Sequence, residues 1–447
     1  MTLYHASVYD TSETAPSYWE DTAGAERDDW TPLGTDTACE VAIIGGGFTG
    51  LSAALHLARD HGVDARVLEA GPIAWGASGR NGGFCLAGAS KLSIDAMARR
   101  YGREETRRFH AAQVEGVELV RALCETESID CDRHGEGVLQ VAHAPGRLAE
   151  LRHEAEQLRD WFDIPAQVCS PDEFRAIGHG GTEQFGGLHI GVGFGLHPLK
   201  FALGLARAAT RHGAVLHGRS RVLGWTREGA THVLRTAGGT LRARQVIVAT
   251  NGYCPEELHP ALGGRVLPAL SSIIVTRPLS EDELAAESYR AVEPVSNTRS
   301  LLFYYRLLPD RRFLFGARGD TTGRPADGAR MRAWMTRRLG EVFPAWREVP
   351  ITHFWRGLIC VTRRLTPAVG CLDDDPSVSF GFGYHGNGVN TAPWVGMRLA
   401  RVASGAIAPE AVAPALMRGL PGRFPFPALR LWALRAAYVG CRLHDRR

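Results

Sequence analysis

The sequence predicts an α/β protein with two domains. The first observation behind this prediction is an apolar, β-branched run at residues 41–44, which is typical of a buried strand. The second is the glycine run that follows at once, Gly45-Gly46-Gly47-Phe48-Thr49-Gly50, which fits the pattern G-x-G-x-x-G. The third is the helical spacing of apolar residues from position 51 onward. Strand, glycine turn and helix therefore follow one another in the order of a Rossmann-like unit.

Each glycine of this motif has its own expected role. Gly45 permits the tight turn, Gly47 lets the backbone approach a pyrophosphate, and Gly50 lets the helix pack against the strand. A second strand at 65–69 ends in Glu69, 19 residues after Gly50, where a ribose-binding acid is expected. The alternative is a glycine-rich turn in an ordinary α/β unit, with Glu69 as a surface acid.

Length and composition narrow the function classes. A chain of 447 residues with 45% hydrophobic and 22% charged residues is globular and long enough for two domains. The net charge of +3 does not suggest a nucleic-acid partner. Nine cysteines without a C-x-x-C pair favour neither a disulfide framework nor a metal site, and suit a reducing cytoplasm. We find no signal peptide and no apolar run of about 18 residues that would predict an integral membrane segment.

Residues 1–36 are expected to form an extended arm with aromatic anchors, and a disordered leader is an equal alternative. The loop 75–83, Trp-Gly-Ala-Ser-Gly-Arg-Asn-Gly-Gly, is too rich in glycine for a regular element and offers backbone N–H groups to a flat ligand; the alternative is a flexible surface loop. Residues 92–163 are expected to be mostly helical, with helices at 103–127 and 146–162, and another helix is expected at 199–212.

The second half is expected to alternate strands with two further helices. Strands are predicted at 214–217, 221–227, 231–236, 245–248, 272–276, 301–306, 313–316 and 351–358, and a helix at 328–343. Another strand–glycine–helix unit covers 380–404 and again presents a helix N-terminus to an anion or a flavin carbonyl, unless the glycines only form a turn. The basic amphipathic stretch at 422–447 predicts a helix that caps the domain, with a peripheral membrane helix as the alternative.

With these pieces in order, the chain resembles the FAD-dependent D-amino-acid-oxidase-like superfamily, and within it the bacterial γ-glutamylputrescine oxidase group. The segments that carry the resemblance are 41–55 with Glu69, 75–83, 197–198, 246–252, 355–357 and 381–388 with the following helix. The resemblance implies an FAD-binding domain assembled from 37–91, 193–264 and 346–410. It implies a substrate domain of antiparallel sheet plus helices from 92–192 and 265–345, between the arm at 1–36 and a helical tail at 411–447.

The resemblance also implies which residues hold FAD. Glu69 would bind the adenosine ribose, Val222 the adenine through its backbone, and residues 386–389 the pyrimidine edge of the flavin. The full set implied is Gly45, Gly47, Phe48, Thr49, Gly50, Glu69, Ala70, Trp75, Gly76, Ala77, Ser78, Arg80, Asn81, Gly82, Gly83, Val222, Thr250, Asn251, Gly252, Gly357, Gly386, Asn387, Gly388 and Val389.

Two departures from the family pattern matter. Some relatives attach FAD covalently through Cys or His, but Cys360 lies a few residues from the family's cysteine position and Arg80 occupies the region of the histidine. We therefore predict non-covalent FAD. In the segment Thr362-Arg-Arg-Leu-Thr-Pro367, Arg364 stands where many relatives carry Asp. The function of that Asp is therefore not assigned to this position.

The expected reaction is the oxidation of a C–H bond next to an amine, by hydride transfer to flavin N5, followed by hydrolysis of the imine. This chemistry requires a desolvated site that favours the neutral amine rather than a strong base. Three residues are the candidate catalytic contacts: His385 in the flavin loop, and Tyr304 and Arg306, which alternation places on one face of a strand. Arg306 could bind a distal carboxylate or phosphonate. The alternatives are a surface ion pair for Arg306 and a structural hydrogen bond for His385, while Trp355 is either a pocket wall or core.

The expected substrate is a small primary or secondary amine, which leaves amino acids, N-methyl amino acids, polyamine derivatives and aminoalkylphosphonates open, and the expected electron acceptor is O2. Some amine oxidases of the superfamily place a lysine near flavin N5, but neither Lys91 nor Lys200 lies in a matching segment. A dehydrogenase with a separate acceptor therefore stays open. A reductase or monooxygenase that uses NAD(P)H would need a second complete glycine motif, which we do not find, and a non-catalytic flavin-binding partner protein is the remaining alternative. Neither the particular amine nor an oligomeric state is predicted.

Overall fold

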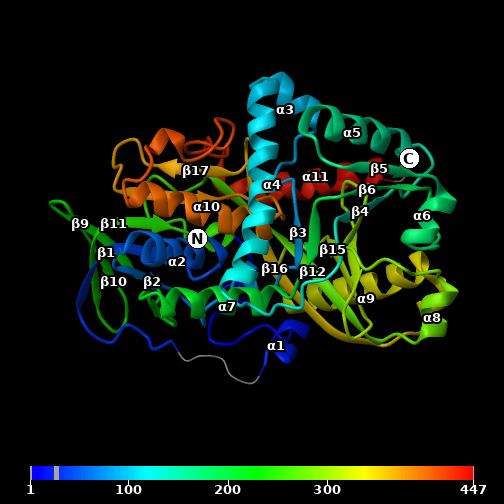
Figure 1. Ribbon diagram of the computed structural model, residues 1–447. Coiled ribbons are helices and arrows are strands. Elements are labelled where there is room, and N and C mark those ends of the chain that lie inside the picture. Colours follow the sequence, from blue (N-terminus) through cyan, green and yellow to red (C-terminus); the bar gives the residue numbers. More distant parts are fainter. Residues whose placement is uncertain (1–2, 25–29, 446–447) are drawn as a thin grey trace.

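The computed structural model describes residues 3–24 and 30–445. Two eight-stranded sheets lie side by side, with helices packed on them (Figure 1). The first sheet has the order β17-β18-β11-β1-β2-β8, with β10 and β9 attached to β11. Its strands are β17 (Ala368–Cys371), β18 (Val378–Phe382), β11 (Thr240–Val248), β1 (Thr37–Ile44), β2 (Ala65–Leu68), β8 (Val215–His217), β10 (Thr231–Arg235) and β9 (Gly224–Glu228).

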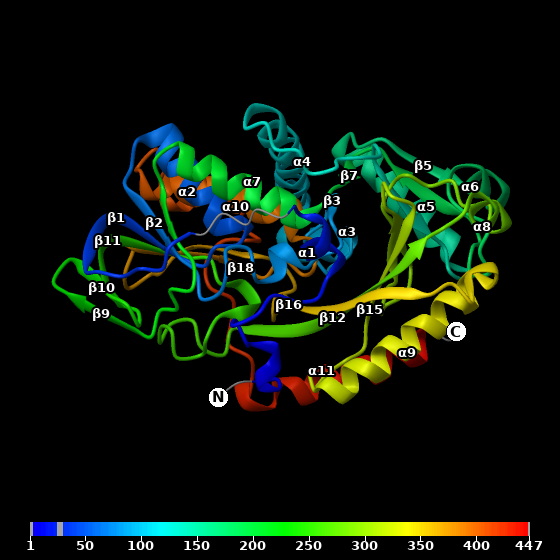
Figure 2. The ribbon, with the colours of Figure 1, turned by 90° about the horizontal axis from the view of Figure 1, so that it is seen from below.

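The centre of the first sheet is parallel, because β18, β11, β1, β2 and β8 all pair in that sense. Helix α2 (Phe48–His61) packs against both α7 (Pro198–Arg211) and α10 (Gly388–Ala403) beside it (Figure 2). The last four residues of β1 are fully buried, as their β-branched sequence predicts. This layer confirms the Rossmann-like α/β class.

The second sheet has the order β16-β12-β15-β14-β13-β4-β6-β5 and is mostly antiparallel. Its strands are β16 (Ile351–Thr362), β12 (Val266–Pro278), β15 (Arg312–Arg318), β14 (Tyr304–Leu307), β13 (Val295–Asn297), β4 (Val138–Val141), β6 (Gly187–Ile190) and β5 (Ala166–Cys169). The short pair β3 (Phe84–Leu86) and β7 (Gly193–Gly195) lies apart from both sheets. The helices around them are α3 (Ile94–Tyr101), α4 (Arg103–Thr126), α5 (Arg147–Phe162), α6 (Pro171–Ile177), α8 (Glu281–Ala286) and α9 (Pro325–Val342).

Two features differ from the sequence-based expectation. The region 92–163, expected to be mostly helical, also contributes β4 to the second sheet. Strand β16, which the expected domain boundaries placed with the FAD-binding segments, pairs along its whole length with β12 of the second sheet. Its pairing depends on residues about 85 positions earlier in the chain, and no local pattern reports such a partner.

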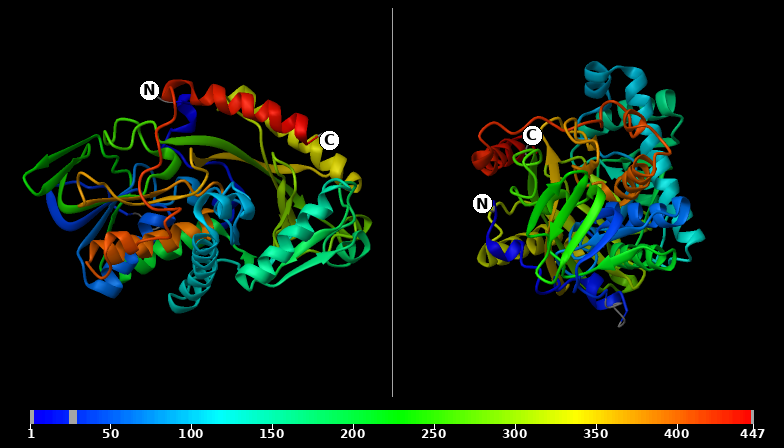
Figure 3. Two further views of the ribbon diagram at one scale, coloured as in Figure 1. Left: turned by 90° about the horizontal axis from the view of Figure 1, so that it is seen from above. Right: turned by 90° about the vertical axis from the view of Figure 1, so that its left-hand side faces the viewer.

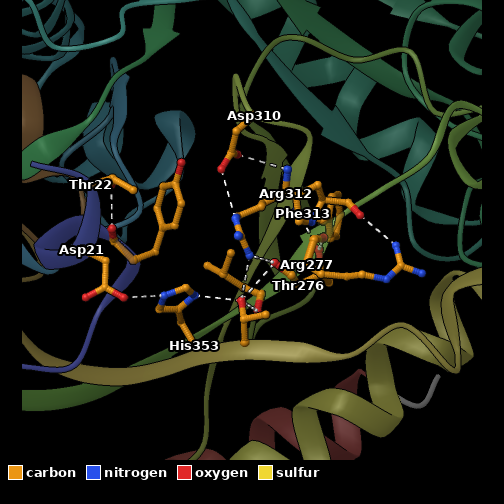
Figure 4. Close-up of polar contacts among 12 residues, drawn as sticks. Asp21, Thr22, Thr276, Arg277, Asp310, Arg312, Phe313 and His353 are labelled. Atoms are coloured by element: carbon orange, nitrogen blue, oxygen red, sulfur yellow. Dashed lines mark hydrogen bonds and ion pairs between the residues drawn. The ribbon is translucent and has the colours of Figure 1, made fainter.

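The N-terminal arm is folded onto the second sheet. Its short helix α1 (Tyr18–Thr22) buries Tyr18 and Trp19. Asp21 pairs with His353 of β16 at 3.0 Å, beside a network in which Arg312 donates to Asp310 and to the carbonyl of Thr276 (Figure 4). Of the aromatic anchors expected of the arm, Tyr18 and Trp19 are thus packed in the interior, whereas Trp30 is half-buried.

The C-terminal helix α11 (Arg430–His444) lies along the outside of the molecule (Figure 3). Leu431, Leu434 and Tyr438 bury one face against a cluster that contains Tyr4 and Leu270. Trp432 and Val439 on the other face are exposed. Within the residues that the structure describes, no helix is both long and apolar enough to cross a membrane.

Candidate active site

The glycine turn between β1 and α2 brings three chain segments into contact. Gly45 has φ +110°, and a Cβ there would lie 2.8 Å from the carbonyl oxygen of Ala249 at the end of β11. A Cβ on Gly50 would lie 1.9 Å from the carbonyl oxygen of Gly45, so only glycine lets the helix approach this closely. Helix α2 begins after Gly47, which has no side chain to cap it, and Gly47, Phe48 and Thr49 at this helix start line the cavity described next.

A long cavity, here named the cofactor cavity, runs from this turn along the carboxyl ends of β1, β2 and β11. Glu69 lines it at the end of β2, and its two carboxylate oxygens accept the N–H groups of Gly46 (2.6 Å) and Gly71 (3.0 Å). Burial raises the pKa of Glu69, while these N–H donors lower it. The carboxylate therefore lies where a dinucleotide fold places its ribose ligand.

The loop 75–83 forms one wall of this cavity and is held by its own polar groups. Ser78 accepts the backbone N–H of Phe48 at 2.9 Å, which ties the loop to the first turn of α2. Arg80 donates to the carbonyl of Trp75 and lies over its indole ring at 4.1 Å. Asn81 donates to the carbonyls of Ala77 and Ser78 and accepts from Gly83. The glycine-rich segment is thus an ordered wall.

The opposite wall is the segment from His385 to Val389. His385 has φ +54° and is fully buried; its Nδ1 has no hydrogen-bond partner, and its Nε2 lies 3.4 Å from Oγ1 of Thr362. Burial first, and then the nearby Lys91, lowers the pKa of His385 to about 3, so the imidazole is neutral. Helix α10 starts at Gly388 without a side-chain cap, which leaves N–H groups available to an acceptor.

The donor set fits an FAD molecule. The starts of helices α2 and α10 and the Glu69 carboxylate lie along one cavity, as phosphates, flavin carbonyls and a ribose require. Two buried polar atoms in its lining, Nδ1 of His385 and Oγ1 of Thr250, have no protein partner. Such atoms are costly to leave unpaired, so a bound polar ligand accounts for them.

Most of the predicted cofactor residues line this cavity. They are Gly45, Gly47, Phe48, Thr49, Glu69, Ala70, Trp75, Gly76, Ala77, Ser78, Asn81, Val222, Thr250, Asn251, Gly386, Gly388 and Val389. Arg80, Gly82, Gly357 and Asn387 line the adjoining cavity instead. Gly50, Gly83 and Gly252 line neither cavity, because each packs against a carbonyl oxygen of the protein.

The adjoining cavity encloses about 650 Å³ between β12, β14, β15 and β16 on one side and α3, α4 and α5 on the other. It shares Ala77, Asn81, Leu358, Ile359, Gly386 and Val389 with the cofactor cavity, so the two meet at the 385–389 segment. We name it the substrate cavity. A flat ring at this junction would be reached from the cofactor cavity on one side and from the substrate cavity on the other.

The substrate cavity contains two cations that sequence reasoning did not select, Lys91 and Arg318. Among the described residues, no ion pair or side-chain hydrogen bond involves either one, and Nε of Arg318 is buried without a partner. A Cβ on Gly386 would lie 2.9 Å from an Nη of Arg318. The side chain of Lys91 lines the cavity and is exposed there, and desolvation together with the nearby Arg318 lowers its pKa to about 7.

Of the two residues predicted on one face of a strand, Tyr304 lines the substrate cavity and Arg306 does not. Tyr304 lines the substrate cavity and its hydroxyl hydrogen-bonds Ser271 at 2.8 Å. Arg306 lies on the same side of β14 but is 1% exposed and lines neither cavity; it donates to the carbonyl of Leu196 (2.6 Å) and to Nε2 of His134 (3.1 Å). Arg306 is therefore not placed where it could contact a substrate carboxylate in this cavity. Trp355 is buried, and its indole N–H donates to the carbonyl of Arg80.

The N-terminal arm supplies residues that no motif indicated. Tyr9 and Thr11 line the cofactor cavity, next to Arg221 and Tyr253. Trp75 of the loop donates to the carbonyl of Glu13 at 2.8 Å, which fixes the arm there. The aromatic residues of the arm were the available signal, but their partners lie more than 60 positions away.

Comparisons with known proteins agree with this geometry. The model of the FAD dependent oxidoreductase family DAO matches residues 40–402. The γ-glutamylputrescine oxidoreductase of Escherichia coli K12 is 32% identical over 416 residues, which cover 92% of this chain and 94% of that protein. Among solved structures, glycine oxidase from Geobacillus kaustophilus has a TM-score of 0.70 at 21% identity, with 82% of this chain and 95% of that chain covered. L-Proline dehydrogenase from P. horikoshii has a TM-score of 0.67 at 19% identity, with 84% and 96% covered.

Proposed function

The chain belongs to the DAO family of FAD-dependent oxidoreductases, and from that premise we propose that it oxidises a primary or secondary amine that carries a carboxylate near the reacting nitrogen. The relatives named for amine and amino-acid substrates support the reaction class. The observation that carries the proposal is the unpaired cation pair, Lys91 and Arg318, at the junction of the two cavities.

Arg318 is the proposed ligand of the substrate carboxylate. A guanidinium binds a carboxylate through two parallel hydrogen bonds, and Arg318 has its donors free of protein acceptors. Its position next to Gly386 would hold the carboxylate beside the 385–389 segment. The carbon next to the substrate nitrogen would then lie at the cavity junction.

Lys91 is the proposed acceptor of the substrate's ammonium proton. Oxidation of an amine requires its neutral form, and a group with a pKa of about 7 can take up that proton near neutral pH. The segment that carries Lys91 is fixed by two hydrogen bonds: Lys91 N–H donates to the carbonyl of Leu365 at 3.0 Å, and the side-chain amide of Asn387, in the 385–389 segment, donates to the carbonyl of Gly88.

FAD, when bound, supplies the two-electron acceptor for this oxidation. The protein's own contribution is to orient the substrate and to exclude water. The rings of Tyr304 and Phe84 meet edge to face at 5.5 Å in the wall of the substrate cavity, and the neutral His385 lines the adjoining cofactor cavity. We assign O2 as the final acceptor, because cationic groups at the junction stabilise the negative charge that oxygen gains on reduction.

Anaerobic titration of the purified holoenzyme with amines tests the proposal. We expect an amine with a neighbouring carboxylate to bleach the visible flavin band, and air to restore it rapidly with release of H2O2. Slow recovery in air together with fast recovery on adding an artificial electron acceptor would make the protein a dehydrogenase. Bleaching by NADPH but by no amine would contradict the proposed function.

A further inference from the structure

The end of the substrate cavity away from FAD is built from α3, α4, α5 and β4, and it is acidic. Glu154 of α5 lines the cavity there, together with Asp95 and Glu150. Two of these three carboxylates are already engaged: Asp95 accepts from Gln157 (2.6 Å) and pairs with His153 (3.0 Å), and Glu150 pairs with Arg147 (2.7 Å). No ion pair among the described residues involves Glu154.

Glu154 is therefore a carboxylate without a cation in a half-buried cavity wall. Its hydrogen-bond partner is the neutral amide of Gln140 on β4, and burial raises its pKa. An enclosed carboxylate is costly to keep ionised unless an opposite charge approaches it, so a cation from a ligand would be bound favourably.

A second polar group at this end has no hydrogen-bond partner in the protein. His110 of α4 is 7% exposed, lines the cavity, and neither of its ring nitrogens has a hydrogen bond. Its ring stacks on Phe162 at 3.9 Å, and burial lowers its pKa to about 4, so the imidazole is neutral. A neutral imidazole offers one donor and one acceptor to whatever fills the cavity.

The two ends of the cavity thus carry opposite charges. Lys91 and Arg318 lie at the junction with the cofactor cavity, while Glu154 lies on α5, which Figures 1 and 3 show on the far side of α4 from α10. A substrate with only an amine and a carboxylate would leave the acidic end empty.

We propose that the substrate carries a second cationic group, distal to the reacting amine, and that Glu154 binds it; this inference rests on the proposed function. The substrate class is an amino acid, free or N-substituted, whose side chain ends in an ammonium or guanidinium group. The carboxylate would contact Arg318, and the distal cation, with its three or more N–H donors, would contact Glu154.

Matched substrate pairs test the inference on the holoenzyme. Both enantiomers of lysine are compared with norleucine, and both enantiomers of ornithine with norvaline, because each pair differs in the terminal ammonium. We expect kcat/KM to favour the cationic member by about 10- to 100-fold. Glu154→Gln should reduce this preference to less than about threefold by raising KM for the cationic member alone. Glu156→Gln, at an exposed position of the same helix, is the control and should keep the preference.

The outcomes separate the inference from the proposed function. Equal oxidation of both members, or a preference that survives Glu154→Gln, would overturn the inference and leave amine oxidation in place. If no amine reduces the flavin, the proposed function fails, and the same pairs are then titrated as ligands through the shift of the flavin spectrum. Tighter binding of the cationic member that disappears in Glu154→Gln would still support the site, and equal binding would overturn it.

Discussion

The backbone N–H of Lys91 donates a 3.0 Å hydrogen bond to the carbonyl of Leu365, and this bond holds the lysine beside the His385 segment. The side chain of Ser90 donates to the same carbonyl. The hydroxyl of Thr362 donates to the carbonyl of Thr366 and lies within hydrogen-bond distance of Nε2 of His385. The position of the only lysine in the substrate cavity is thus set by contacts between segments about 275 residues apart.

The pH dependence of flavin reduction should report Lys91. The pKa of Lys91 is lowered to about 7, so its neutral, proton-accepting form increases as the pH rises through that value. We expect kcat/KM to rise between about pH 6 and 8, and Lys91→Met to lower it about 100-fold and move the rise toward the pKa of the substrate ammonium. Stopped-flow reduction across pH measures this. Lys200→Met, which removes a lysine paired with Asp132, is the control, and an unchanged profile in Lys91→Met would contradict the role.

Arg318→Met should weaken binding of carboxylate-bearing substrates selectively. Loss of charge-assisted hydrogen bonds predicts a 10- to 100-fold higher KM, with a smaller effect on kcat. The decarboxylated analogue of each substrate should show little change. Steady-state kinetics with both compounds measure the difference, and an equal loss for both would argue against a carboxylate contact. Arg337→Met, on the exposed side of α9, serves as the control.

Gly50→Ala should destabilise the fold. The added Cβ would meet the carbonyl oxygen of Gly45 at 1.9 Å and the side chain of Ile43 at 3.1 Å, and neither strand nor turn can move without disturbing the sheet. We expect a loss of about 3 kcal/mol in the free energy of unfolding. Urea unfolding of the apoprotein measures it. Gly146→Ala, at a position with open space and an ordinary φ, should change stability by less than about 1 kcal/mol.

Arg306→Met should reduce stability without changing substrate recognition. The substitution leaves the carbonyl of Leu196 and Nε2 of His134 without their donor in the interior, at a cost of about 2–3 kcal/mol. Arg306→Lys should not restore it, because a single ammonium cannot reproduce the two-armed contact. Thermal unfolding and KM are measured together. A large rise in KM at unchanged stability would contradict this prediction and indicate that Arg306 contacts the substrate.

FAD should leave the protein on acid precipitation. Cys360 lines the cofactor cavity, but it is 1% exposed and burial raises the pKa of its thiol, so the thiolate needed for attachment is not formed. We expect the yellow colour in the supernatant after denaturation, for wild type and Cys360→Ser alike. A yellow pellet in the wild type that disappears in Cys360→Ser would show a covalent bond.

Local sequence patterns were sufficient to predict the elements and most of the residues that line the cofactor cavity. The order strand, glycine turn, helix and acid predicts β1, α2, β2 and the position of Glu69, because these elements are neighbours in the chain and their chemistry is set within about 30 residues. The sequence also singled out the glycine segments at 75–83 and 381–388, and residues of both line the cofactor cavity.

The substrate half depended on tertiary structure. Alternation correctly placed Tyr304 and Arg306 on one side of a strand, but only the packing of Leu196 and His134 decides that Arg306 is bound by the protein while Tyr304 lines the cavity. Lys91, Arg318 and Glu154 lie in segments without a motif, and they meet one cavity only because the second sheet and the helices α3 to α5 enclose it. Sequence alone thus determined the cofactor and the reaction family through local patterns, whereas long-range packing decided which charged side chains line the substrate cavity.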